Sequence, residues 1–169
     1  ITYEKQLLNN TFVGLAILGT IISVVPSVTA ICNALGRIGY STISDKLKDR
    51  AKIYVIIFIS CITVTLAARF IPAGWLIITM LMIINLGYGG GFSTLPALLD
   101  SRFGIENISK IHGLALSAWA IAGLTGNNLS ELILSRTDNN YSIVITVAAV
   151  LYAVACVICL TMVIKRKFV

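Results

Sequence analysis

The stretch from Asn33 to Arg50 reads NALGRIGYSTISDKLKDR and passes from apolar sequence into a cluster of charged residues. Upstream of it, the residues from Phe12 to Leu35 are mostly apolar or small. A bilayer core about 30 Å thick is crossed by about 20 apolar residues in a helix. The stretch therefore marks the end of a predicted membrane helix over about 12–40, which is followed by a charged loop over 41–52.

The composition of the whole chain indicates the same class of protein. Of its 169 residues, 57% are hydrophobic and 12% are charged, and the mean hydropathy is +0.93. A soluble domain has about 25% charged residues. We therefore expect an all-α, polytopic membrane helical bundle whose surroundings are the lipid bilayer. The net charge of +6 does not indicate a nucleic-acid partner, because most of the basic residues fall in predicted loops.

Four further apolar stretches predict helices that cross the membrane, at about 53–71, 75–99, 111–134 and 142–164. The fourth of the five predicted spans, over 111–134, is rich in small and polar residues. We expect protein neighbours rather than lipid on much of its surface. The five spans form a single transmembrane domain over 1–169, and the connections are too short to hold a soluble domain.

The basic residues gather at one end of the predicted bundle. That end carries ten of the thirteen Lys and Arg residues, which are Arg37, Lys46, Lys48, Arg50, Lys52, Arg102, Lys110, Lys165, Arg166 and Lys167. Cytoplasmic loops are enriched in Lys and Arg, so we expect the C-terminus in the cytoplasm and the protein in the plasma (inner) membrane. Five spans then place the N-terminus outside, and we expect further helices of the same protein upstream of Ile1.

Arg37 lies eight residues before Asp45, the first acidic residue of the predicted loop. At 1.5 Å per helical residue, this separation places Arg37 about 12 Å below the surface. Asn33 and Tyr40 share its helix face. Two interpretations remain open: Arg37 pairs with a loop acid or with backbone carbonyls, or it faces a water-filled cavity and binds an anion. Ionisable residues inside membranes favour the second.

The third predicted span contains the sequence NLGYGGGFSTLP, from Asn85 to Pro96. Glycine permits close approach of two helices, and proline removes a backbone hydrogen bond and bends a helix. Gly89, Gly90, Gly91 and Pro96 are thus expected to pack closely, to line a cavity or to act as a hinge. These roles are compatible with one another.

Trp119 lies about 10 Å along its helix from His112. Tryptophan is normally found at membrane interfaces, so a Trp at this depth is predicted to form a pocket wall, together with Tyr88. Arg37, the glycine-rich stretch and Trp119 are thus predicted at a similar depth. Such a convergence indicates a midplane binding site of the kind found in transporters.

Six of the seven acidic residues are predicted in loops or near helix ends, at Asp45, Asp49, Asp100, Glu106, Glu131 and Asp138, and none is predicted at the midplane. Without a carboxylate at the midplane, exchange or facilitated movement is favoured over proton coupling. The chain has no Ser-His-Asp set, no metal-ligand spacing of His and Cys, and no phosphate loop. We therefore expect neither an enzyme nor a metal or cofactor site.

The loop after the first span resembles the signature loop of the major facilitator superfamily. Asp45 and Lys46 match that pattern and Asp49–Arg50 end it, while Ser41 and Lys48 stand where the pattern has glycine. The resemblance implies that Asp45, Lys46 and Arg50 form a charge relay between helices, which latches one conformation closed.

A second resemblance covers GYGGGFSTLPALLDSRFGIENISKIHGLALSAWAIAGLTGN, over 87–127, and extends to most of the chain. This sequence is similar to the oxalate:formate antiporter family, which implies spans eight to twelve of a twelve-span carrier, with the first helix of the C-terminal half missing. Arg37 then matches an Arg in the family's eighth helix. Ser117–Ala120 occupy the place of a Lys in its eleventh helix.

One fewer cation penalises a dianion, so the resemblance implies a monocarboxylate such as formate, lactate or pyruvate. The predicted function is a secondary active or facilitative transporter of small organic anions, by exchange or uptake, which works by rocking-bundle alternating access. Arg37 and Asn33 would bind the anion, and Trp119 and Tyr88 would shape the pocket. The alternative is a transporter-like membrane sensor or receptor that does not transport.

Overall fold

The computed structural model describes residues 2–14, 16, 18–47, 49–71 and 73–165, which form six α-helices and, over those ranges, no β-strand. The helices are α1 (Thr2–Thr11), α2 (Leu18–Lys46), α3 (Ala51–Phe70), α4 (Gly74–Phe103), α5 (Ile108–Arg136) and α6 (Tyr141–Lys165). The predicted all-α class is confirmed. Lys48, Arg166 and Lys167 of the predicted basic end lie outside the described residues.

Four of these helices, α2, α3, α4 and α6, are long and apolar enough to cross a membrane. The chain is therefore an integral membrane protein on the length and composition of its helices. Helix α5 has 29 residues but is less apolar, because its sequence is interrupted by the polar residues TGNNLSE at 125–131. The predicted crossing over 111–134, which lies within α5, stays a prediction.

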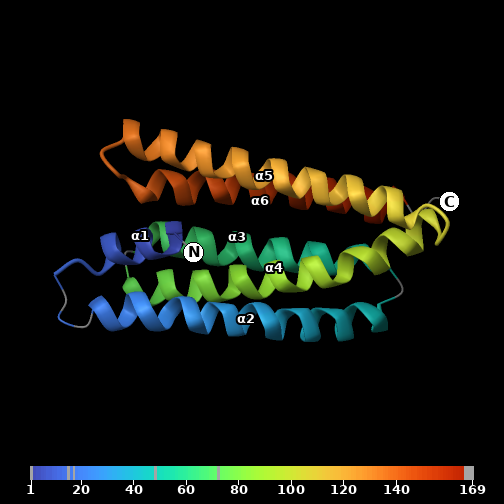
Figure 1. The fold of residues 1–169 in the computed structure, drawn as a ribbon, viewed down its shortest axis with the longest axis horizontal. Helices are drawn as coiled ribbons and strands as arrows, with labels where there is room; N and C mark the ends of the chain where they lie inside the picture. The colour runs from blue at the N-terminus through green and yellow to red at the C-terminus, as the bar shows by residue number, and fades with distance from the viewer. Residues whose placement is uncertain (1, 15, 17, 48, 72, 166–169) are drawn as a thin grey trace.

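The long helices run side by side in three groups, with α2 on one side, α3 and α4 in the middle, and α5 and α6 on the opposite side (Figure 1). The α2–α3 and α4–α5 connections lie at one end of the bundle, which we call the Asp45 end. The α1–α2, α3–α4 and α5–α6 connections lie at the other, which we call the Asn139 end. Each long helix therefore joins the two ends.

Helix α2 begins and ends later along the chain than the predicted span 12–40. It begins at Leu18 and continues through the polar residues of STISDK to Lys46, within the predicted loop 41–52. The segment before it folds as the separate polar helix α1. This short helix is held against the bundle by Leu8, which is fully buried, and by Phe12, whose ring lies against Gly74 at the start of α4.

The central helices pack in two different ways. Helices α3, α4 and α6 share an apolar core formed by Ala68, Leu76, Ile77, Met80 and Ile145. Helices α2 and α4 instead approach backbone to backbone, because a Cβ at Gly36 would overlap the Leu86 carbonyl and a Cβ at Gly89 would overlap the Asn33 carbonyl. Glycine at these positions therefore sets the α2–α4 distance.

Candidate functional site

Arg37 projects from the exposed side of α2, where its Nε donates a hydrogen bond to Asn33 Oδ1 at 3.3 Å. One helical turn separates the two residues, which share a helix face as predicted, whereas the Tyr40 ring packs against Gly90 of α4. The Arg37 backbone carbonyl accepts a hydrogen bond from Ser93 Oγ of α4 at 3.1 Å. This bond fixes Arg37 at the level of the glycine-rich stretch. Among the described residues no carboxylate pairs with this guanidinium.

Tyr88 and Trp119 meet between α4 and α5. Trp119 Nε1 donates a hydrogen bond to Tyr88 Oη at 2.8 Å, and Phe92 packs edge-on against the indole with ring centroids 5.6 Å apart. These aromatic rings line a cavity of about 340 Å³ between α3, α4, α5 and α6. The cavity is apolar, since its lining comprises aliphatic, aromatic and small residues, with the Tyr54 and Tyr152 rings opposite.

The four predicted anion-site residues thus form two pairs rather than one site. Arg37 and Asn33 lie on α2, whereas Tyr88 and Trp119 lie between α4 and α5 and line a cavity to which neither α2 residue contributes. Both pairs lie near the glycine-rich stretch of α4. Figure 1 shows α4 between α2, which carries Arg37, and α5, which carries Trp119.

Gly89, Gly90, Gly91 and Pro96 lie within one continuous helix, α4. Gly89 contacts the α2 backbone, and a Cβ at Gly90 would overlap the Tyr40 ring. Gly91 lines the aromatic cavity, and its carbonyl accepts a hydrogen bond from Tyr54 Oη at 2.7 Å. Close packing and cavity lining are therefore both present, on different faces of the helix, while hinge motion stays a prediction.

The predicted latch residues lie together at the Asp45 end. Arg50 pairs with Asp45 at 3.2 Å, and both side chains are substantially exposed. Lys46 ends α2 as an exposed residue and forms no ion pair with the described residues. The Asp45–Arg50 pair spans only the α2–α3 connection, and pairs at such exposure stabilise weakly.

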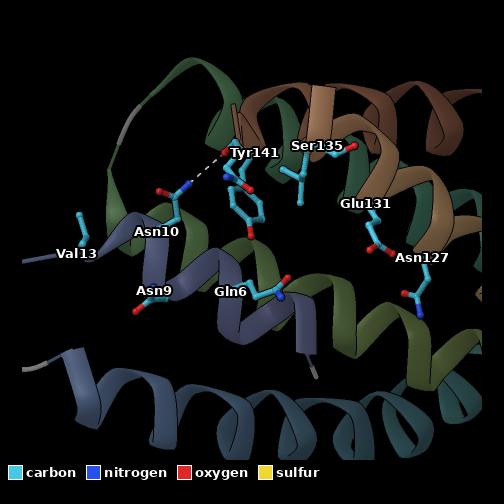
Figure 2. A pocket seen from close by; sticks show the side chains of 10 residues that line it. Gln6, Asn9, Asn10, Val13, Asn127, Glu131, Ser135 and Tyr141 are labelled. Carbon is cyan, nitrogen blue, oxygen red and sulfur yellow. Dashed lines mark hydrogen bonds between the residues drawn. The ribbon is translucent and has the colours of Figure 1, made fainter. Parts of the chain in front are cut away.

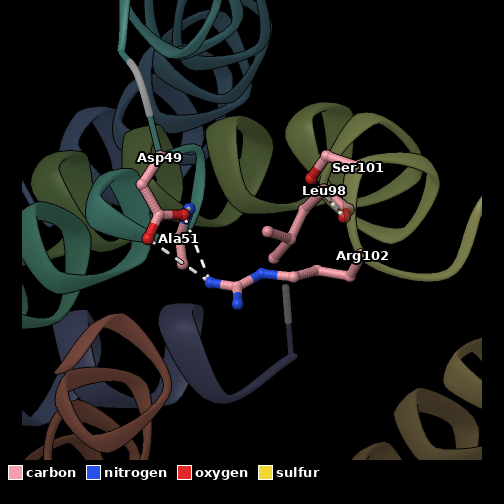
Figure 3. Close-up of polar contacts among 5 residues, drawn as sticks. All are labelled: Asp49, Ala51, Leu98, Ser101 and Arg102. Atoms are coloured by element: carbon pink, nitrogen blue, oxygen red, sulfur yellow. Dashed lines mark hydrogen bonds and ion pairs between the residues drawn. The ribbon is translucent and has the colours of Figure 1, made fainter. Parts of the chain in front are cut away.

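A stronger tie is made by Asp49, which sequence reasoning placed only at the end of the loop motif. Arg102 Nη2 donates to Asp49 Oδ1 at 3.2 Å and to Oδ2 at 3.4 Å, and the Ala51 N–H donates to Oδ1 at 3.1 Å (Figure 3). Asp49 is 8% exposed. The pair thus joins the start of α3 to the last turn of α4.

Glu4 lies in the first turn of α1, a helix that the predicted membrane spans did not include. Helix α1 folds back along α2, and Thr29 Oγ1 donates a hydrogen bond to Glu4 Oε1 at 2.7 Å. Thr29 is 2% exposed and lies eleven residues from Leu18 and seventeen from Lys46, near the middle of α2. The polar sequence of 2–11 did not predict this contact with α2.

A polar cleft of about 850 Å³ opens at the Asn139 end between α1 and α5 (Figure 2). Carboxamides, hydroxyls and one carboxylate line it, from Gln6, Asn9, Asn10, Asn127, Glu131, Ser135, Asn139 and Tyr141. The Asn10 carboxamide donates to the Asn139 carbonyl at 3.4 Å across its mouth. The sequence placed Asn127 and Glu131 toward this end but not α1 opposite them.

Comparison with protein-family models, with curated proteins and with solved structures finds no match to this chain. The site is therefore assigned from its own residues. Within the described part of the chain, no group of three or more His, Cys, Asp or Glu side chains is arranged to hold a metal ion. The arrangement offers the Arg37 guanidinium and the Asn33 carboxamide on α2, an apolar aromatic cavity, and the Glu4 carboxylate beside the middle of α2.

Proposed function

We propose that this chain is part of a secondary carrier that moves small organic anions across a membrane by rocking-bundle alternating access. The observation that carries the proposal is Arg37, an exposed guanidinium about 12 Å along α2 from Asp45, which bonds only the neutral Asn33 side chain among the described side chains. A buried or intramembrane cation is stable when an anion or water accompanies it. A carboxylate solute supplies that anion.

The Arg37 guanidinium suits this role because its planar fork of donors binds both oxygens of a carboxylate. Asn33 holds the fork from one side through its Oδ1, which leaves the terminal nitrogens for a solute. Two small-residue contacts, at Gly36 and Gly89, hold α2 against α4 beside this position. A rocking motion that moves these helices as one unit would expose the guanidinium to each membrane face in turn.

We propose a monocarboxylate such as formate, lactate or pyruvate as the substrate, rather than the dianion oxalate. The segment Ser117–Ala120 of α5 contains no cation, and the aromatic cavity beside it has no charged lining residue. A single guanidinium neutralises one carboxylate, whereas a second, unpaired negative charge would be expensive away from water. The resemblance to the oxalate:formate antiporter family supports an organic-anion carrier of the major facilitator type.

The test is counterflow in proteoliposomes that contain the purified full-length protein. Vesicles loaded with unlabelled pyruvate, lactate or formate should accumulate the same labelled anion transiently, and protein-free vesicles should not. Oxalate should be a poor substrate. A protein that binds these anions without counterflow would instead be the transporter-like sensor, and preferred transport of oxalate would contradict the monocarboxylate assignment.

A further inference from the structure

Arg69 lies in the last turn of α3, at the Asn139 end of the bundle. Its Nε donates a hydrogen bond to Thr146 Oγ1 of α6 at 3.1 Å, and its guanidinium carbon lies 6.0 Å from the centre of the Phe70 ring. Within the described residues no carboxylate pairs with this guanidinium, and no acceptor bonds its two terminal nitrogens. A cation here interacts favourably with the C-terminal end of the helix dipole, but the terminal nitrogens remain available to a ligand.

A cavity of about 330 Å³ lies beside Arg69, where α1, α3, α4 and α6 meet the α5–α6 connection. We call this cavity the Arg69 pocket. Its other polar lining residues are Asn10, Thr11, Asn139, Asn140, Tyr141 and Ser142, and among the described residues no Asp or Glu lines it. Small-molecule sites occupy about 300–1,000 Å³ and hold a few convergent polar groups, so the Arg69 pocket is large enough for a small solute or a lipid headgroup.

Hydrogen bonds hold the donors of the Arg69 pocket in place. The Thr146 hydroxyl accepts from Arg69 Nε and donates to the Ser142 carbonyl at 2.8 Å. The Asn140 Oδ1 accepts from the Ser142 backbone N–H at 3.1 Å. The Ser142 hydroxyl and the Asn140 amide nitrogen bond nothing among the described residues. The pocket therefore gathers unused donors from α3, α6 and the α5–α6 connection around one positive charge.

The Arg69 pocket is separate from the proposed Arg37 site. Arg69 lies eighteen residues beyond the first residue of α3, about 27 Å along that helix from the Asp45 end, whereas Arg37 lies about 12 Å along α2 from Asp45. The pocket adjoins the polar cleft between α1 and α5, because the two share lining residues that include Asn139. Their charges differ, since Glu131 lines the cleft and Arg69 lines the pocket.

From these unused donors we propose that the Arg69 pocket binds one oxyanion, which is either a soluble monocarboxylate or the phosphate of an anionic lipid headgroup. A guanidinium binds two oxygens of either group. The adjoining polar cleft gives access from water, and the exposed aromatic residues Phe70 and Trp75 are of the kind found at headgroup level. Only the use of this site to load a transported anion rests on the proposed carrier.

Cysteine protection in the purified full-length protein tests the proposal. Ala73→Cys, in a variant whose other cysteines are replaced, places a thiol on the lining of the Arg69 pocket and keeps every donor of the pocket. In detergent without anionic lipid, a neutral maleimide should react with this thiol several-fold more slowly in pyruvate or inorganic phosphate than in chloride at equal ionic strength. Arg69→Gln should remove this protection, and Arg136→Gln, at the same end on α5, should retain it.

The same thiol in nanodiscs distinguishes the two sources of the oxyanion. Arg69-dependent protection by phosphatidylglycerol relative to phosphatidylcholine, without protection by pyruvate or phosphate, would assign a headgroup, and the opposite pattern would assign a soluble anion. Unchanged rates with all three probes, or protection that Arg69→Gln retains, would overturn the site. Pyruvate counterflow without protection would reject the Arg69 pocket and leave the carrier intact, whereas protection without counterflow would keep the pocket and reject the carrier.

Discussion

Arg37 is held at the level of the glycine-rich stretch by its own backbone, whose carbonyl accepts from Ser93 Oγ, while its guanidinium remains on the exposed side of α2. The position of Arg37 in the bundle therefore depends on its backbone and not on its charged side chain. A neutral replacement should leave the α2–α4 contact in place, because that contact uses Gly36 and the Ser41–Ser93 hydroxyl pair at 2.8 Å rather than the Arg37 side chain.

Substitution of Arg37 separates charge from packing. We expect Arg37→Ala to abolish counterflow and Arg37→Lys to retain part of it, because Lys supplies the charge but not the bidentate fork. A charge-assisted hydrogen bond contributes about 1.5–3 kcal/mol, which corresponds to a loss of about ten-fold or more in anion affinity. Unfolding temperature in detergent is the control and should change little. Wild-type counterflow by the Ala variant would contradict the assignment.

Asp49 and Asp45 form a matched pair of acids at the same end of the bundle. The Asp49 side chain is 11% exposed and the Asp45 side chain 65% exposed. We expect Asp49→Asn to reduce the free energy of unfolding by about 1–3 kcal/mol, since Arg102 loses its partner in a half-buried position. Asp45→Asn should cost about 1 kcal/mol or less. Chemical unfolding in detergent measures both, and equal losses would refute this ranking.

Helices α2 and α4 approach each other closely, and this contact depends on glycines from both helices. Gly36 and Gly39 lie one turn apart on α2, but a Cβ at Gly36 would overlap the Leu86 carbonyl, whereas nothing lies within 4 Å of a Cβ at Gly39. The two positions therefore differ in packing and share the same helical context.

Alanine substitution should distinguish these two glycines. We expect Gly36→Ala to destabilise by about 1–3 kcal/mol, because overpacking forces the backbones apart, and Gly39→Ala to be neutral or to stabilise by up to about 1 kcal/mol through helix propensity. Gly91→Ala tests the hinge, because a Cβ there meets only Tyr54 at 3.6 Å. A loss of transport rate without a loss of stability would support hinge motion.

Hydropathy predicted the helices α3, α4 and α6 closely, because each is a long apolar run bounded by polar residues. It ended the first span at Tyr40, although α2 continues to Lys46, since polar residues such as STISDK remain helical once a helix is nucleated. It missed α1 because TYEKQLLNNT contains no apolar run. That helix is held by contacts with residues far along the chain, at Thr29 and Gly74.

At the scale of the whole molecule, the pairs that join distant segments could not be read from the sequence. Residue spacing along one helix predicted that Arg37 and Asn33 share a face, and in the structure their side chains are hydrogen-bonded. Asp49 and Arg102 are 53 residues apart, and local patterns carry no information about such a contact. For the same reason the sequence placed Arg37 and Trp119 at a similar depth but not on different sides of α4.

The distribution of charge predicts how the whole bundle is oriented. Ten of the thirteen Lys and Arg residues belong to the end that holds Asp45 and the C-terminus, so we expect that end in the cytoplasm. In a bacterial host, a C-terminal green fluorescent protein fusion should be fluorescent and a C-terminal alkaline phosphatase fusion inactive. The reverse result would invert the orientation and place the polar cleft on the cytoplasmic side.

The water accessibility of position 37 in the full-length protein tests most directly whether Arg37 is a cation that a solute can reach. Arg37→Cys in a variant whose other cysteines are replaced should react with a small, membrane-impermeant, charged thiol reagent, and pyruvate should slow that reaction. Leu35→Cys is the control, because Leu35 lies on the same helix and is also exposed. Its thiol should not react, since the membrane-impermeant reagent does not enter lipid. A thiol at position 37 that is unreactive from both sides, or that reacts at a rate pyruvate does not change, would contradict a solute-accessible cation at this depth.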